Sequence, residues 1–283
     1  MSENDMTSDT NSTLVLVEEC AGGTYFVENG GKRIGVFKPS EEEIGMHNNP
    51  KAAGEVWSIE QKGFEEGNGW IREIATYKID QGWSGVPPTK EHEIGGKKGS
   101  YQDFCVSNGS LEDLLERGGS ICKLSKESIH RIAILDLIIL NCDRHDGNVL
   151  ITDKGQLIPI DHGLCFPSCL ESLSFAWRFW PQAKSPFGDE EKQWVQKQPD
   201  GRDFMSCLRK LGIDQKSAEL SAAALEVLKH CIKYDWTARQ LGDFWERHIC
   251  TKPSRLELLL DKCKQDGSID FDLLQKELEV LKE

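Results

Sequence analysis

The sequence predicts a two-lobed α+β fold, with a β-rich N-terminal lobe followed by a mainly helical C-terminal lobe. Two observations predict it: β-rich runs gather in the first part of the chain, and apolar residues at helical spacing dominate the second part. A length of 283 residues suits one two-lobed domain or two small domains, and it is enough to bury a core. We place a disordered tail at 1–12, the N-lobe at 13–106 and the C-lobe at 107–283.

The composition argues against some classes of function. The chain carries 34 Lys and Arg against 47 Asp and Glu, which gives a net charge of −13. This acidic excess argues against nonspecific nucleic-acid binding and, less strongly, against constitutive binding to an anionic membrane. No apolar run approaches the roughly 20 residues of a membrane-spanning helix, and the polar, acidic start predicts no signal peptide. Ten cysteines without a C-x-x-C pair favour reduced thiols, so we expect a cytoplasmic protein.

In the N-lobe, the pattern predicts three strands and one helix, at 14–17, 24–28, 32–37 and 70–79. Asn29, Gly30 and Gly31 lie between the second and third strands. They are a strong hairpin signal, because a tight turn needs positive φ angles. The stretch 41–69 is Gly-rich and acidic without a clear period, so we expect an excursion from the sheet there.

In the C-lobe, one helix is predicted to be buried on most sides. Ser125 stands where an N-cap is expected, apolar residues then recur at helical spacing, and the helix is expected to end at Cys142 and Asp143. Four or five further amphipathic helices are expected from about Asp203 to the end. Between these parts, two short strands are predicted at 148–151 and 157–160.

Asp143, Asn148 and Asp161 have the most informative spacing in the chain. An Asp is followed five residues later by an Asn, and a second Asp stands on the far side of a short hairpin. Phosphoryl transfer needs a carboxylate near the attacking hydroxyl, and it needs an amide oxygen and a second carboxylate to hold magnesium on the phosphates. A helix that ends at Asp143 before a two-stranded hairpin puts all three groups at one edge of the lobe.

The same residues resemble those of a known family. The motifs Asp143-Arg144-His145-x-x-Asn148 and Asp161-His162-Gly163 resemble the catalytic and metal-binding loops of the phosphatidylinositol 3- and 4-kinase superfamily. The similarity covers roughly residues 20–210 and implies a protein-kinase-like fold of the phosphatidylinositol kinase type. Further motifs, in family order, resemble the type II and plant gamma-type phosphatidylinositol 4-kinases, at 22–26, 36–39, 72–75, 85–89, 99–102 and 180–183.

The resemblance also implies residue roles. Asp143 orients or deprotonates the acceptor hydroxyl and His145 assists there, while Asn148 and Asp161 coordinate Mg²⁺ or Mn²⁺. A hinge at 101–106 meets adenine through its backbone. The residues implied to bind ATP are Gly22, Gly23 and Thr24 in the phosphate loop, Lys38 on the phosphates with Glu73 as its ion-pair partner, and Phe104, Cys105 and Val106 in the hinge. Glycine lets backbone N–H groups approach phosphates closely.

The implied activity is that of an ATP- and Mg²⁺-dependent kinase that phosphorylates phosphatidylinositol at the 4-hydroxyl, with peripheral contact to a membrane. A Ser/Thr protein kinase or a kinase of soluble inositol phosphates on the same fold stays open as an alternative. The segment after Asp161 should select the acceptor. Between residues 164 and 192 its basic side chains are Arg178, Lys184 and Lys192, fewer than a highly charged inositol phosphate favours.

A remote alternative is a metal-dependent phosphohydrolase that uses Asp143, His145, Asp161 and His162. A zinc site built on His162, Cys165 and Cys169 belongs to the same alternative, although structural zinc sites normally bring two spaced ligand pairs.

Ordinary structural roles also stay open. Lys38 could be a solvated strand residue and Glu73 a solvated helix residue, while His162 is expected only to pack beneath the metal-binding loop. The aromatic residues of the following segment favour the core over a lipid-contacting surface: Phe166, Trp177, Phe179 and Trp180.

Overall fold

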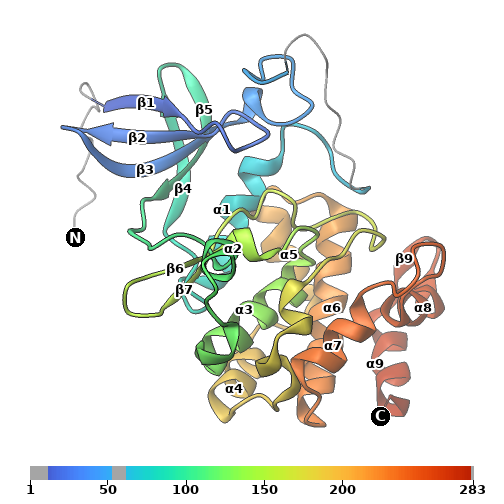
Figure 1. The fold of residues 1–283 in the computed structure, drawn as a ribbon. Helices are drawn as coiled ribbons and strands as arrows, with labels where there is room; N and C mark the ends of the chain where they lie inside the picture. The colour runs from blue at the N-terminus through green and yellow to red at the C-terminus, as the bar shows by residue number, and fades with distance from the viewer. Residues whose placement is uncertain (1–11, 53–61, 282–283) are drawn as a thin grey trace, which may run out of the picture.

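The computed structural model describes residues 12–52 and 62–281, which form a β-sheet lobe above a mainly helical lobe (Figure 1). The two-lobed α+β fold predicted from the sequence is confirmed. The tail predicted at 1–12 lies outside the described residues, except that Ser12 begins the first strand. None of the described helices is long and apolar enough to cross a membrane.

One antiparallel sheet makes up most of the upper lobe, with its five strands in the spatial order β1-β2-β3-β5-β4. The strands are β1 (Ser12–Leu16), β2 (Tyr25–Asn29), β3 (Lys32–Pro39), β4 (Thr89–Ile94) and β5 (Lys97–Asp103). The predicted hairpin between β2 and β3 is confirmed, with Gly30 at a φ of 57° and Gly31 at a φ of 76°. A short 3₁₀ helix, η1 (Ser40–Glu42), follows β3.

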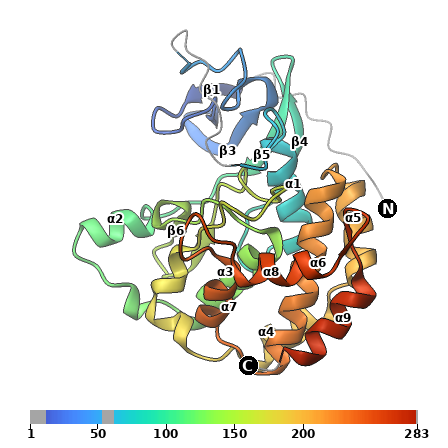
Figure 2. The same ribbon diagram turned by 90° about the vertical axis from the view of Figure 1, so that its right-hand side faces the viewer.

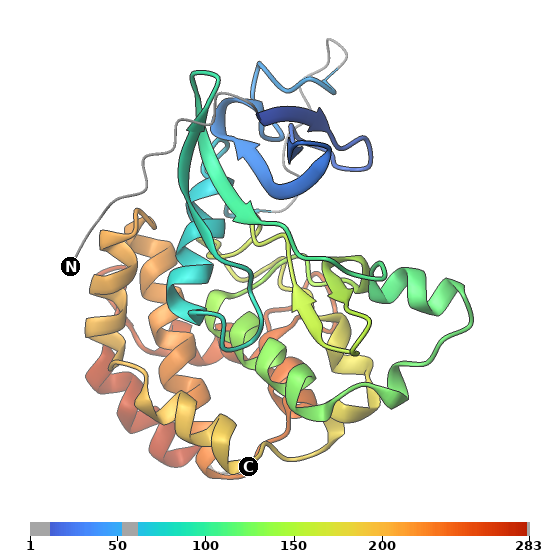
Figure 3. The same cartoon turned by 90° about the vertical axis from the view of Figure 1, so that its left-hand side faces the viewer.

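The strand β5 shortens the predicted hinge. The sequence places the hinge at 101–106, but Tyr101 pairs with Phe37 of β3 and the strand continues to Asp103. The backbone N–H and C=O groups of a strand inside a sheet are hydrogen-bonded to the neighbouring strands. The residues of β5 therefore cannot also bind a ligand through these groups. The chain leaves the sheet at Phe104 and enters the lower lobe at α2 (Leu111–Glu116), a path that Figure 3 shows in green.

The helix α1 (Gly69–Asp80) confirms the helix predicted at 70–79 and lies between the lobes. Its buried Ala75 belongs to the same hydrophobic core as the helices of the lower lobe, whereas the sheet has a separate small core. Just beyond α1, Trp83 stacks on Trp194 of the lower lobe, with the ring centroids 4.0 Å apart. The helix therefore contacts β4 and β5 of the sheet and also contributes Ala75 to the core of the lower lobe.

The helix α3 (Lys126–Ile139) runs through the lower lobe and is buried on most sides, as predicted. Ser125 caps its start, because its hydroxyl accepts a hydrogen bond from the backbone N–H of Ser128 at 3.1 Å. The predicted end near Asp143 is wrong. Leu140 adopts a left-handed conformation with a φ of 54°, which terminates the helix and sends the chain into the loop that carries Asp143.

The rest of the lower lobe is helical, with two small hairpins. The hairpins are formed by β6 (Val149–Ile151) with β7 (Leu157–Pro159) and by β8 (Lys264–Gln265) with β9 (Ser268–Ile269). The α-helices are α4 (Asp189–Lys197), α5 (Gly201–Lys210), α6 (Gln215–Lys233), α7 (Ala238–Trp245), α8 (Arg255–Lys262) and α9 (Phe271–Val280). The 3₁₀ helices are η2 (Ile121–Lys123), η3 (Asp146–Asn148), η4 (Ala176–Phe179) and η5 (Pro181–Lys184).

The arrangement of these helices buries α3. Both α6 and α7 pack against α3, and α9 packs on α6 farther out (Figure 2). The helices α5 to α9 confirm the expectation of four or five helices from about Asp203. The core of the lower lobe therefore lies directly beneath the loop that follows α3.

Candidate active site

The predicted catalytic and metal-binding residues lie at the upper edge of the lower lobe. Asn148 precedes β6 and Asp161 follows β7, so both lie at the open end of this antiparallel hairpin. Across that end, the backbone N–H of Ile160 donates to the carbonyl of Asn148 at 3.1 Å. The side-chain amide of Asn148 donates to the carbonyl oxygen of Asp143 at 2.9 Å. The hairpin therefore brings the three groups together.

Asp143 is partly buried, and its surroundings make it a stronger base. Burial raises the pKa of Asp143, and the negative charge of Asp161 raises it further. The side chain of Asn141 accepts a hydrogen bond from the backbone N–H of Asp143 at 2.8 Å, which fixes the loop. A carboxylate with a raised pKa takes a proton from a hydroxyl more readily.

Asp161 and Asn148 fit a divalent cation. The carboxylate of Asp161 is 45% exposed, and the amide nitrogen of Asn148 is committed to the loop, which leaves the amide oxygen as a ligand. Mg²⁺ and Mn²⁺ prefer such hard oxygen donors, and a cation nearby would relieve the repulsion between Asp143 and Asp161. Within 12–52 and 62–281 no cluster of three or more His, Cys, Asp or Glu side chains is suited to a metal, so the fit rests on one carboxylate and one amide.

Lys38 on β3 connects the sheet to both α1 and the hairpin. Its ammonium nitrogen lies 2.5 Å from Oε1 of Glu73 and 2.9 Å from Oδ1 of Asp161. Burial alone lowers the pKa of Lys38, but the two carboxylates outweigh burial and the pKa is raised. Burial likewise raises the pKa of Glu73, yet Lys38 and His162 together outweigh burial and the pKa is lowered. Both side chains are therefore charged and paired, so the solvated alternative is wrong for them.

His162 does more than pack beneath the metal-binding loop. The guanidinium of Arg144 donates from Nη2 to Nε2 of His162 at 3.0 Å. Because arginine has no acceptor, Nε2 must be the acceptor and the ring proton of a neutral His162 lies on Nδ1. That Nδ1 faces Oε2 of Glu73 at 3.7 Å. The fully buried imidazole thus lies between the α1 carboxylate and the catalytic loop.

Arg144 is the centre of a buried hydrogen-bond network. Its Nε donates to Oδ2 of Asp136 at 3.0 Å, and its Nη1 donates to the carbonyls of Asn148 at 2.5 Å and Ile160 at 3.0 Å. Trp177 adds a hydrogen bond from Nε1 to Oδ2 of Asp136 at 3.0 Å. Sequence reasoning missed this network. The sequence feature that could have indicated it is Asp136, in the middle of an otherwise apolar helix, because a buried carboxylate requires a hydrogen-bonding or charged partner.

The structure gives Gly23 a packing role. Its backbone N–H donates to the carbonyl of Glu42 at 2.7 Å, and a Cβ at this position would lie 2.6 Å from Cβ of Glu42. That N–H is therefore not available to a phosphate, contrary to the expectation for Gly23. Gly22 makes no such contact below 3.4 Å, and the adjacent Thr24 is buried, so their contact with phosphates stays a prediction.

The phosphate loop, residues 17–24, is clamped by the segment that the sequence left without a role. The ammonium of Lys51 donates to the carbonyls of Val17 and Cys20. The side-chain amide of Asn49 donates to the carbonyl of Ala21 at 3.1 Å. These long side chains follow no period, so no pattern in the sequence predicts their targets. Asn49 and Lys51, in the segment 41–69 that the sequence predicted as an excursion from the sheet, therefore fix the position of the phosphate loop.

The hinge residues and His145 differ in how their polar groups are engaged. The N–H of Phe104 donates to the carbonyl of Ile34 at 3.1 Å, whereas the N–H groups of Cys105 and Val106 donate to no other group among the described residues. Burial raises the pKa of the half-buried Cys105 thiol, and Asp103 adds to this. His145 is exposed, and its Nδ1 accepts a hydrogen bond from the N–H of Gly147 at 3.1 Å.

The geometry weakens the zinc alternative and separates the aromatic residues. Both ring nitrogens of His162 already face Arg144 and Glu73, so this histidine is not presented to a metal. Three of the four aromatic side chains after Asp161 are buried, as favoured from the sequence, but Phe179 is 64% exposed.

The chain is similar to known proteins over most of its length. Residues 21–225 match the family described as phosphatidylinositol 3- and 4-kinase. A protein named "Phosphatidylinositol 4-kinase gamma 4" from Arabidopsis thaliana is 32% identical over 89% of this chain and 49% of its own length. Its namesake from Oryza sativa subsp. japonica is 32% identical over 88% of this chain and 48% of its own length. The Arabidopsis "Phosphatidylinositol 4-kinase gamma 1" is 37% identical over 64% of this chain and 37% of its own length. The chain spans about half the length of the first two.

Proposed function

Since the chain belongs to the phosphatidylinositol 3- and 4-kinase family, we propose that it transfers the γ-phosphate of ATP to the 4-hydroxyl of phosphatidylinositol. The observation that carries the proposal is the contact of one ammonium group, that of Lys38, with both Glu73 and Asp161. Three elements distant in the sequence thereby meet at the place where a kinase holds the phosphates and metal of ATP. The names of the similar proteins supply the lipid and the 4-position.

ATP would bind between the sheet and the lower lobe. Lys38 supplies positive charge for the phosphates, with Gly22 and Thr24 above them. The free backbone N–H groups of Cys105 and Val106 suit the edge of adenine, since unpaired donors next to a partly buried side chain favour a polar ring. Supporting this placement, a small cavity lies next to Lys38 and is lined by Val36, Lys38, Glu73, Ser100 and Gln102.

Asp143 would act on the acceptor. Its carboxylate takes the proton of the hydroxyl as the hydroxyl oxygen bonds to the γ-phosphorus, and the bond from that phosphorus to the leaving ADP oxygen breaks. Asn148 and Asp161 would hold Mg²⁺ or Mn²⁺, which neutralises charge on the phosphates. His145, exposed beside Asp143, is placed to meet the acceptor, and its assistance there is part of the proposal.

A membrane-bound acceptor is favoured by Phe179. This ring is 64% exposed on the segment that follows the metal-binding loop. The guanidinium carbon of Arg178 lies over it, 4.5 Å from the ring centroid. Asp243 and Glu246 already pair with this guanidinium, at 2.8 and 2.6 Å, so the ring alone remains to contact a membrane. An exposed aromatic ring suits the interface between lipid headgroups and acyl chains. We therefore include peripheral membrane contact at Phe179 in the proposal.

The experiment is a transfer assay on the purified chain. Radiolabelled ATP, Mg²⁺ and phosphatidylinositol in mixed micelles should yield a product whose deacylated headgroup elutes as the 4-phosphate. Asp143→Asn should lower transfer by about 10²-fold or more while ATP binding is retained, because charge and proton positioning are lost. Asp153→Asn, an exposed turn residue between β6 and β7, is the matched control and should keep full activity.

The same assay separates the alternatives. Soluble inositol phosphates and a generic protein substrate are tested in parallel, and label in one of these alone would replace the lipid as acceptor. No labelled lipid with either Mg²⁺ or Mn²⁺ would contradict the proposed activity. An Asp143→Asn variant that keeps about a tenth of the normal turnover would contradict the role of Asp143.

A further inference from the structure

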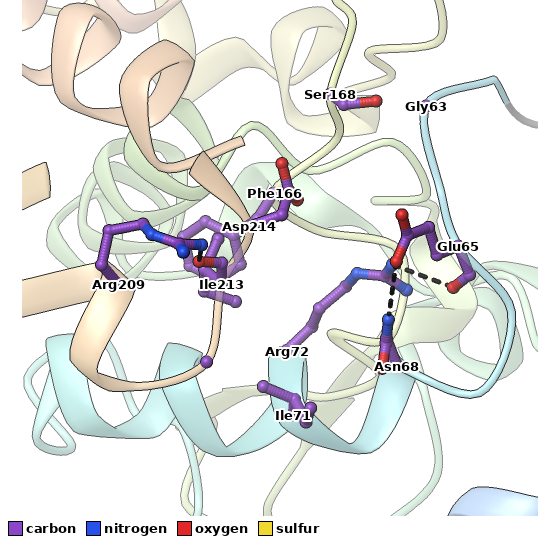
Figure 4. A pocket seen from close by; sticks show the side chains of 11 residues that line it. Gly63, Glu65, Asn68, Ile71, Arg72, Phe166, Ser168, Arg209, Ile213 and Asp214 are labelled. Carbon is purple, nitrogen blue, oxygen red and sulfur yellow. Dashed lines mark hydrogen bonds between the residues drawn. The ribbon is translucent and has the colours of Figure 1, made fainter. Parts of the chain in front are cut away.

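A cavity of about 250 Å³ lies beside α1, where three loops and two helices meet (Figure 4). It shares no residue with the small cavity next to Lys38. Its walls come from the segment before α1, from α1 itself, from the loop after the metal-binding motif and from the turn between α5 and α6. Its polar lining consists of Glu65, Asn68, Arg72, Ser168, Arg209 and Asp214.

Arg72 on α1 is a buried cation without a carboxylate partner. It is 7% exposed, and its guanidinium donates to the carbonyl of Gly163 at 3.3 Å and to the carbonyl of Glu65 at 3.1 Å. Within 12–52 and 62–281, no Asp or Glu oxygen lies within 4.0 Å of this guanidinium. A buried charge is costly unless an opposite charge compensates it. Attraction to Glu43, Asp214 and Glu65 compensates this one only in part, because burial outweighs it and the pKa of the guanidinium is lowered. A buried guanidinium that lines a cavity and has no carboxylate in ion-pair contact favours the binding of an anion in that cavity.

A second guanidinium lines the same cavity from α5. Arg209 donates from Nη1 to the carbonyl of Ile213 at 2.5 Å, and it too has no carboxylate within 4.0 Å among the described residues. Figure 4 shows Arg209 reaching in from the end of α5 while Arg72 rises from α1. Two planar guanidinium groups on one cavity match the oxygens of a phosphate better than single ammonium groups would.

The carboxylates of the cavity are already engaged but keep accepting capacity. Glu65 accepts from the amide of Asn68 at 3.2 Å, and Asp214 caps α6 by accepting from the N–H of Ser217 at 3.0 Å. Each carboxylate has further lone pairs, and these accept from hydroxyl groups. Inorganic phosphate offers these lone pairs only its own P–OH groups, whereas a phosphate ester that carries alcohol hydroxyls can place its phosphate on the guanidinium groups and its hydroxyls on the carboxylates.

We propose that this cavity is a second binding site, separate from the nucleotide cleft, for a small polyol phosphate. Its phosphate is bound by Arg72 and Arg209, and its hydroxyls donate to Glu65 and Asp214. The cavity is smaller than the roughly 300–1,000 Å³ of drug-sized sites, so the ligand is a compact one. Because Arg72 neighbours Glu73 on α1, an occupant would tie that helix to the turn after α5.

The test is isothermal titration calorimetry on the full chain, with a nonhydrolysable ATP analogue and Mg²⁺ present to fill the nucleotide cleft. Glycerol 3-phosphate is the probe, and inorganic phosphate and glycerol are the comparison ligands. We expect saturable binding of glycerol 3-phosphate, weaker binding of inorganic phosphate and none of glycerol. Arg209→Gln should weaken glycerol 3-phosphate by about tenfold, since one charged hydrogen-bonding partner is lost.

Arg202→Gln is the matched control, because Arg202 lies on the same helix, pairs with Asp272 and does not line the cavity. It should bind the probe as the unchanged protein does. The absence of saturable binding below about 10 mM, or equal affinity in Arg209→Gln, would overturn the proposal. The Arg209 variant assigns binding to this cavity even if the chain proves not to bind ATP, so the two proposals fail independently.

Discussion

Replacing Arg144 with Met should destabilise the fold more than almost any other single change. The guanidinium is 1% exposed and is the cationic partner of Asp136, which is fully buried in α3. Methionine keeps much of the volume but removes every donor. Asp136 then retains its hydrogen bonds from Trp177 and Asn141 but loses the positively charged partner that compensates its carboxylate.

The magnitude follows from what is left unpaired. Removing one partner of a buried ion pair costs about 3–5 kcal/mol, because the other charge stays in a medium of low dielectric constant. The carbonyls of Asn148 and Ile160 also lose a charged donor, which places the change toward the upper end of that range. We therefore expect the free energy of unfolding to fall by about 5 kcal/mol in Arg144→Met.

Urea unfolding followed by tryptophan fluorescence and far-UV circular dichroism measures this change. The double variant Asp136→Asn/Arg144→Met should lose only about 2 kcal/mol, because the uncompensated carboxylate is gone. Arg202→Gln, an exposed arginine, should change stability by less than about 0.5 kcal/mol. A loss below about 1 kcal/mol in Arg144→Met, or a double variant that is less stable than the single one, would refute this reasoning.

Three further predictions concern the loop, a helix end and the hinge. Lys51→Met removes the donor to two carbonyls of the phosphate loop, so it should raise the KM for ATP about fivefold with little change in kcat. The control variant Lys98→Met, whose lysine forms an exposed surface ion pair, should change neither KM nor kcat. An unchanged KM would mean that the clamp does not position the loop. Gln81→Gly should raise the free energy of unfolding by about 0.5–1 kcal/mol, since this exposed residue ends α1 at a φ of 50° that glycine adopts without strain. Thermal unfolding measures the change, and a loss of stability would contradict the prediction. Cys105 should react slowly with iodoacetamide at pH 7, because its raised pKa leaves little thiolate, and an ATP analogue with Mg²⁺ should slow it further. The exposed Cys207 should react at a rate that the nucleotide does not alter, and equal protection of both thiols would count against adenine at the hinge.

The hairpin that carries Asn148 and Asp161 could be predicted from the sequence because its geometry is local. A helix end, two short strands and a tight turn occupy one continuous stretch, and the residue types in that stretch match the needs of phosphoryl transfer. The resemblance to a kinase family rests on the same short-range order, and the family match confirms it. The end of α3 was misplaced because a left-handed Leu140 gives no composition signal.

Contacts between the two lobes could not be predicted from such local sequence patterns. Lys38 and Asp161 are 123 residues apart, and their 2.9 Å contact depends on how the sheet settles over the hairpin. Likewise α1 has a helical period that the sequence shows, but its inner face joins the core of the lower lobe through Ala75. A period states that one face is apolar and does not state which neighbour covers it.

Sequence alone therefore established the order of most elements, although not β4 and β5, together with the acidic charge, the Asp143-to-Asp161 spacing and the resemblance to the family. Those properties follow from backbone preferences and residue chemistry that act over a few positions. The tertiary structure decided which charges are paired: Arg144 meets a carboxylate in α3, whereas Arg72 lines a cavity and has no carboxylate within ion-pair distance among the described residues. Burial sets the energy of a charge, and burial exists only after distant segments have packed together.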